Sequence, residues 1–312
     1  MQFSKSVERV IAFTVENAST TAERAAQSLA AKLVQVEGLK TFPVVAQKTM
    51  AILSDPDFEI AEVSRIVSED PALGARVMRV ANSAFYSRGM KVASFEQAVV
   101  RLGRIAVREV VAGAATMGLF PDSTGIGKAF RDHCAATASV AKTLARDLAP
   151  ALEDGAFLTG LLHDIGKLLI LSAGDPLYGR QDAAMLLTPD RTHLIELDEL
   201  GFDHAALAGQ ILWHWQIPDP VPQIVAWHHQ PALAYTEPVV DVVTAFLRIA
   251  DHVEPMLAAN EEHALSFIDL FAAGPDCRFT GVSADDLRRA WPQMIAARDE
   301  SLSLFGENVA RA

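Results

Sequence analysis

The chain has 312 residues, which is enough for one large domain or two modest ones. Half of its residues are hydrophobic, only 7% are aromatic, and alternating strand patterns are nearly absent, so the composition predicts an all-α protein. The formal net charge is −12, and Lys and Arg form no cluster. This charge disfavours binding to a nucleic-acid backbone.

The composition also bears on the compartment. No uninterrupted apolar run reaches the roughly 18 residues that a membrane span needs, and the N-terminus lacks the pattern of a secretion signal. The only cysteines, Cys134 and Cys277, lie far apart in the sequence. We therefore expect a cytoplasmic protein with reduced thiols and no membrane partner.

In chain order, residues 1–36 are expected to form a helical arm that packs on the body or on a second copy in a homodimer. A free arm is the alternative. Residues 37–120 contain a dense series of short helices. Asp70 is expected to cap one of them with Pro71 in its first turn, and Gly103 is expected to break a later one.

Residues 121–260 are expected to form a second helical subdomain, which begins in a stretch rich in Gly, Pro and Asp. Residues 261–312 are expected to form a C-terminal helical extension. Its apolar residues Leu287, Trp291, Met294 and Ile295 recur at helical spacing.

The run GLLHDIGK at 160–167 places His163, Asp164 and Lys167 in strongly apolar surroundings. A buried His-Asp pair is costly unless the two groups pair with each other or bind a metal. Further candidate ligands follow at wide intervals on predicted helices: His133, His204, His228, His229 and Asp251. Such a series is typical of helical metal-dependent phosphohydrolases of the HD type.

Two groups of motifs carry a resemblance to a known family. In the first half they are IVSEDPAL at 66–73, RVMRVANSAFY at 76–86, SFEQAV at 94–99 and RLG at 101–103, and in the second half HHQP at 228–231. These runs closely resemble the HDOD family, the HD-related output domains of bacterial signalling proteins. The resemblance spans residues 36–255.

The resemblance implies an N-terminal helical subdomain packed on an HD-like helical subdomain, and a regulatory role exercised through a signalling partner or a ligand. It also implies two ion sites. His133, His163, Asp164 and Asp251 would hold one ion, and His204 with His228 or His229 would hold a second, with Asp164 between them. Imidazole and carboxylate ligands together suit Fe, Mn, Co, Ni or Zn better than Ca or Mg.

Two functional hypotheses stay open. The favoured one is a signalling module with little or no catalysis, in which the His and Asp residues pair with each other and fix the packing. The alternative is a metal-dependent phosphohydrolase, with Asp164 and Lys167 in the reaction, acting on a nucleotide or related phosphoester. The Gly-Tyr-Pro extension that follows the His pair in cyclic-di-GMP phosphodiesterases is missing after His229, which speaks against that substrate.

Other polar and aromatic residues receive structural interpretations. Asn82 is expected to cap a helix end and fix the next turn, and Arg76 to be solvated or paired with Glu69. Trp213 and Trp215 are expected to pack in the core. The isolated histidines are interpreted as surface or packing residues: His193, in a polar loop, and His214, His252 and His263.

Overall fold

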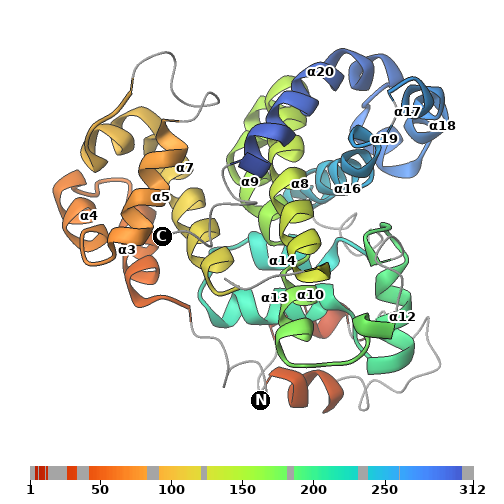
Figure 1. Ribbon diagram of the computed structural model, residues 1–312, viewed down its shortest axis with the longest axis horizontal. Helices are drawn as coiled ribbons and strands as arrows, with labels where there is room; N and C mark the ends of the chain where they lie inside the picture. Colours follow the sequence, from red (N-terminus) through yellow and green to blue (C-terminus); the bar gives the residue numbers. More distant parts are fainter. Residues whose placement is uncertain are drawn as a thin grey trace.

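The computed structural model describes residues 4–5, 7–10, 12, 27–33, 42–82, 91–120, 125–180, 186–230, 238–259 and 261–303. Within these ranges every regular element is a helix, which confirms the predicted fold class. Figure 1 shows the helices as a separate lobe on one side and a larger assembly on the other.

The lobe is drawn in orange and yellow in Figure 1, and within the described residues it is built from helices. They are α3 (Val44–Ser54), α4 (Ile60–Val67), α5 (Pro71–Ala81) and α7 (Phe95–Gly118). Helix α5 begins as predicted, because the Asp70 carboxylate accepts hydrogen bonds from the backbone N–H groups of Ala72 and Leu73. Gly103 interrupts α7 with φ 77° and ψ 164°, a conformation that favours glycine.

Two polar side chains of α5 bind backbone groups of the same lobe. The Asn82 amide, at the C-terminal end of α5, donates to the Val92 carbonyl (3.0 Å) and accepts from the Val92 N–H (2.7 Å). Arg76 donates to the carbonyl of Ala114 on α7 at 2.9 Å. The structural interpretation of Asn82 is therefore confirmed. The pairing of Arg76 with Glu69 is wrong, because the guanidinium crosses to the neighbouring helix instead.

The larger assembly is organised around α8 (Ile126–Leu148), which contacts α9, α10, α16 and α20. Its other helices are α9 (Glu153–Leu162), α10 (Ile165–Ser172), α12 (Thr192–Leu200), α13 (His204–His214), α14 (Val221–Trp227) and α16 (Pro238–Leu257), with short 3₁₀ turns at Pro150–Leu152 and Tyr178–Arg180. Apolar side chains of the lobe and of these helices belong to one hydrophobic cluster. The expected subdomain boundaries stay predictions.

Two glycines let the helices around residues 163–164 lie backbone to backbone on their neighbours. A Cβ on Gly160 of α9 would lie 2.6 Å from the Cα of Ala138 on α8. A Cβ on Gly166 of α10 would lie 2.0 Å from the carbonyl oxygen of His204 on α13. These contacts fix the distances between the helices that carry the candidate ligands.

The C-terminal part consists of four helices, drawn in blue in Figure 1. They are α17 (Glu261–Ser266), α18 (Ile268–Ala272), α19 (Pro275–Thr280) and α20 (Ala284–Ser301). Helix α20 starts with a reciprocal capping box between Ser283 and Asp286. It buries Leu287, Trp291 and Met294, the predicted apolar face, and packs against α8.

The described parts of the N-terminal arm pack on the body. The backbone N–H of Ser4 donates to the side chain of Gln210 on α13 (2.9 Å), and Arg9 lies over the ring of Trp227 on α14 (4.6 Å). Lys32 pairs with Asp175 at 2.8 Å. These contacts place the arm beside α13 and α14, which carry or precede the candidate ligands of the second half of the chain.

One described segment, Gly155–Ser172, is long and apolar enough to cross a membrane by composition alone. It spans α9, the turn at 163–164 and α10, and 83% of it is buried inside the protein. The protein's own helices therefore cover this segment, which makes it a core segment.

Candidate metal centre

His163 and Asp164 form the two-residue turn between α9 and α10 and are 0% and 1% exposed. The Nδ1 of His163 donates to the carbonyl of Gly160 one turn earlier, at 2.8 Å. This bond aims Nε2 at the carboxylates of Asp164 and Asp251, each with an oxygen 3.5 Å away. The break between the two helices therefore presents both side chains to one interior space.

His133 from α8 and Asp251 from α16 complete the first half of the cluster, which consists of His133, His163, Asp164 and Asp251. The Nε2 of His133 lies 2.9 Å from Oδ1 of Asp251 and 3.8 Å from Oδ2 of Asp164. Three segments that are far apart in the sequence thus meet at one point: α8, the turn between α9 and α10, and α16.

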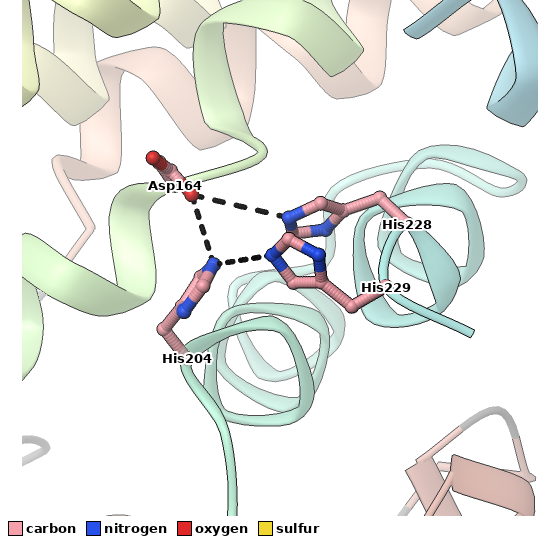
Figure 2. A group of neighbouring side chains, drawn as sticks. All are labelled: Asp164, His204, His228 and His229. Atoms are coloured by element: carbon pink, nitrogen blue, oxygen red, sulfur yellow. Dashed lines mark hydrogen bonds and ion pairs between the residues drawn. The ribbon is translucent and has the colours of Figure 1, made fainter. Parts of the chain in front are cut away.

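The second half of the cluster consists of Asp164, His204, His228 and His229 (Figure 2). Oδ1 of Asp164 lies 2.9 Å from Nε2 of His204 and 3.9 Å from Nε2 of His228. The Nε2 of His229 lies 3.1 Å from that of His204. Asp164 directs Oδ2 to the first half and Oδ1 to the second, so its carboxylate belongs to both. All seven candidate ligands lie in this one buried cluster.

The five imidazoles share one hydrogen-bonding pattern. Each Nδ1 lies 2.7–3.1 Å from a carboxylate or carbonyl oxygen, which can only accept, so each Nδ1 carries a hydrogen. The Nε2 atoms face the cluster, and those of His163 and His228 are buried without a hydrogen bond. This pattern is typical of metal-ligating histidines, whose outer nitrogen is held by a carboxylate or a carbonyl.

Two glutamates that sequence reasoning missed hold these rings. Glu196 is fully buried and accepts from His204 Nδ1 (2.7 Å), the His204 backbone N–H (2.6 Å) and the Tyr178 hydroxyl (2.6 Å). Glu254 accepts from His133 Nδ1 at 2.8 Å. A signal existed for Glu254, because it lies three residues after Asp251 on one helix and shares its face. No spacing pointed to Glu196.

The carboxylates of Asp164 and Asp251 are ionised, and the pKa values of His133, His204 and His228 are shifted in two different directions. Burial would raise the pKa of Asp164, but His163, Lys167 and His204 hold it well below its usual value. Burial would lower the pKa of His133 and His204, but their carboxylate partners raise it to about 10 and about 9. Burial and neighbouring imidazoles lower the pKa of His228. Protonated side chains therefore supply the positive charge that the buried carboxylates require.

Lys167 is part of this charge balance. It follows Asp164 by three residues, is 5% exposed, and places Nζ 2.6 Å from Oδ2 of Asp164. Burial lowers the pKa of Lys167, but the charge of Asp164 outweighs burial and raises it, so the side chain is an ammonium ion. The structure thus brings both residues with a predicted part in catalysis into direct contact.

Asp190 forms a separate polar group at the edge of the second half. Its carboxylate accepts from His229 Nδ1 (3.1 Å), His252 Nε2 (3.0 Å) and Arg248 (3.2 Å). His193 lies on α12, is 7% exposed and stacks on His229 with ring centroids 4.3 Å apart. Parallel rings cannot direct their lone pairs at one ion, and the guanidinium already neutralises Asp190, so this group fits structure better than metal.

Several structural interpretations need correction. The sequence predicts a polar loop around His193. The structure instead starts α12 at Thr192, so that His193 lies in its first turn, and the side chain of His193 is buried. Trp215 is buried and packs on Phe42, as expected, whereas Trp213 is 40% exposed. His214 and His263 are exposed, as expected.

The HDOD domain family model matches residues 39–231. The chain belongs to this family. The match includes the lobe and every candidate ligand except Asp251, which lies beyond it together with Glu254. A protein of Treponema pallidum (strain Nichols), described only as uncharacterized, is 19% identical to this HDOD chain over 196 residues. The match covers 62% of this chain and only 38% of that protein's length.

Solved structures with the same arrangement of helices belong to bacterial proteins. One from Shewanella amazonensis SB2B, named "Putative phosphohydrolase", is 26% identical, with a TM-score of 0.69 over 88% of this chain and 98% of that one. An HDOD domain protein of unknown function from Geobacter sulfurreducens is 22% identical, with a TM-score of 0.64 over 87% and 98%. A "Putative signal transduction protein" from Marinobacter aquaeolei VT8 is 21% identical, with a TM-score of 0.64 over 91% and 65%.

The buried His and Asp cluster of this HDOD protein is able to hold metal. The ligand atoms of His133, His163 and Asp164 in the first half lie within 4.8 Å of one another, and so do those of the four residues of the second half. The unpartnered Nε2 atoms of His163 and His228 are donors that a cation would use. Imidazoles with a few carboxylates suit Fe, Mn, Co, Ni or Zn, whereas Ca and Mg prefer oxygen.

Proposed function

We propose that this HDOD protein is a metal-dependent phosphohydrolase whose cluster holds two divalent transition-metal ions. The observation that carries the proposal is the position of Asp164, whose two oxygens face separate sets of imidazole Nε2 atoms. A shared carboxylate between two ligand sets is what a two-ion centre requires. The outward Nδ1 bonds support the same conclusion, because the Nε2 atoms of His163 and His228 point inward and are buried without a hydrogen bond that would explain their orientation.

Ions bound here would supply Lewis-acid activation of water and of a phosphoryl oxygen. The protein's own residues account for the rest. Asp164 and Asp251 contribute negative charge, and the Nδ1 bonds keep the five imidazoles oriented. The Lys167 ammonium lies at the shared carboxylate, where it can bind a phosphoryl oxygen or give a proton to the leaving group.

The substrate class is a nucleotide or a related small phosphoester. The missing Gly-Tyr-Pro extension after His229 argues against cyclic-di-GMP, and the residues that follow, 231–237, lie outside the described part of the chain. The name of the Shewanella relative agrees with the reaction class.

The test is metal content by inductively coupled plasma mass spectrometry on protein purified without a metal-affinity tag, followed by a phosphoester screen. We expect one or two ions per chain, and loss of the ions and of hydrolysis in Asp164→Ala. Asp147→Ala is the matched control, because Asp147 lies on the surface of α8 and pairs with Arg146, away from the cluster. An empty wild-type centre, or hydrolysis that survives Asp164→Ala, would contradict the proposal.

A second candidate function is binding to a signalling partner through the lobe. The lobe supplies none of the candidate ligands, yet it exposes Val44 of α3 (60%) and Val100 of α7 (72%) to solvent. The Marinobacter relative is named as a signal transduction protein. Capture of a specific partner from an extract of the host, lost in Val100→Asp but kept in Asp164→Ala, would support this role. Equal capture by wild type, Val100→Asp and Asp164→Ala would contradict it.

A further inference from the structure

Helix α20 reaches the first half of the cluster through a continuous chain of contacts. Arg298 Nε donates to Oε1 of Glu254 at 2.9 Å, and Oε2 of Glu254 accepts from Nδ1 of His133 at 2.8 Å. His133 Nε2 then lies 2.9 Å from Asp251. Arg298 and Glu254 both lie beyond residues 39–231, the part that matches the family.

We propose that Arg298 is a positioning residue for the ion of the first half: it fixes Glu254, and Glu254 fixes the ring of His133. The inference rests on the proposed function, because it assumes that His133 binds an ion. It adds that α20, in the C-terminal extension, completes this half of the centre. The half around His204 is linked to the extension by another route, from Asp276 through Arg248 and Asp190 to His229.

The two carboxylate oxygens of Glu254 bind different partners. This carboxylate is 6% exposed, and each oxygen has a different partner, Arg298 on one side and His133 on the other. Loss of the guanidinium would leave a buried oxygen without its charged donor, which is costly. The carboxylate would then be free to rotate, which weakens its hold on Nδ1 of His133.

The side chains of Glu254 and Arg298 are not packed closely on every side. A cavity of about 360 Å³ borders the same contacts. It is lined by Ala129, Asp132, His133, Leu187, Glu254, Pro255, Ala258, Arg298 and Leu302. Glu254 borders this space, so the polar contacts with Arg298 and His133, rather than close packing on every side, hold its carboxylate in place.

Helix α20, which carries Arg298, is itself anchored on α8. The hydroxyl of Ser301 donates to the carbonyl of Ala135 on α8, two residues after His133, at 2.6 Å. Nη1 of Arg298 donates to Oδ1 of Asp299 at 3.2 Å. The guanidinium is thus presented from a helix that is tied to the same turn of α8 that carries His133.

The experiment measures Mn²⁺ affinity by calorimetric titration of the full-length protein in two backgrounds. His229→Ala disables the second half and reports on the first, and His133→Ala does the reverse. In the His229→Ala background, Arg298→Gln is expected to weaken Mn²⁺ binding about 10-fold, the lower end for residues that hold a ligand. Arg298→Lys should recover part of this loss. In the His133→Ala background, Arg298→Gln should change nothing.

Arg289→Gln is the matched control, because Arg289 lies on the exposed side of the same helix and pairs with Asp286. Equal weakening in both backgrounds, or unchanged affinity in the His229→Ala background, would overturn the positioning role while leaving the proposed function intact. Wild-type protein that binds no Mn²⁺ at all would overturn both.

Discussion

Gly166→Ala tests whether the backbone contact between α10 and α13 sets the geometry of the cluster. The added Cβ would lie 2.0 Å from the carbonyl oxygen, 2.7 Å from the carbonyl carbon and 2.9 Å from the Cα of His204. A close carbon-to-oxygen contact is about 3.3 Å, so the two helices must separate by roughly 1.3 Å. All three atoms are backbone, so no rotation of a side chain relieves the clash.

Overpacking of this kind costs about 1–3 kcal/mol of the free energy of unfolding. The same shift lengthens the 2.9 Å distance between His204 and Asp164. Metal–nitrogen bonds of about 2.0–2.1 Å do not tolerate a shift of this size. We therefore expect Gly166→Ala to lose free energy of unfolding, measured by urea denaturation, and to lose the ion of the second half first, measured by mass spectrometry.

Gly179→Ala is the matched control, because a Cβ there would meet no atom within 4 Å and the residue has no positive φ. It should behave as wild type in both measurements. If Gly166→Ala were as stable as this control and kept its full metal content, the close approach of the two helices would not be what positions the cluster.

Three further predictions follow from the same structure. Gly74→Ala should raise the free energy of unfolding by about 0.5–1 kcal/mol, because the residue lies inside α5 and its Cβ would meet only Val67 at an ordinary 3.5 Å; a lower urea midpoint would contradict this. Glu196→Gln should weaken Mn²⁺ binding to the second half about 10- to 100-fold in the His133→Ala background, and an unchanged isotherm would show that Glu196 does not hold His204. Chelation of bound ions should lower the thermal midpoint, since a ligand at 100 times its Kd adds about 2.7 kcal/mol, and Mn²⁺ should restore it in wild type but not in Asp164→Ala.

The sequence contained strong signals for local structure. The cap at Asp70 and the kink at Gly103 depend on a few adjacent residues, and both are present in the structure. The family motifs and the all-helical class were equally readable, because they rest on composition and on runs of neighbouring residues. The candidate ligands could be selected because His and Asp in apolar helices are costly without a partner.

The supporting residues could not be found in the same way. Glu196 reaches His204 because α12 and α13 pack against each other. A glutamate in a helix with other acidic residues carries no signal that it is buried. His193 was misplaced because a polar run resembles a loop whether or not a helix begins inside it. Arg298 depends on the packing of α20 against α8 and α16, which no local pattern encodes.

The core segment Gly155–Ser172 has a consequence for biosynthesis. It is the stretch that a membrane-span criterion selects, and the helices that cover it include α13, α14 and α16, which follow it in the chain. At about 5–20 residues per second, the ribosome needs roughly 4–17 s to make the chain between the end of α10 and the end of α16. During that time the nascent chain presents an uncovered apolar segment. We therefore expect Gly155–Ser172 to be the principal chaperone-binding and aggregation-prone segment of the unfinished protein.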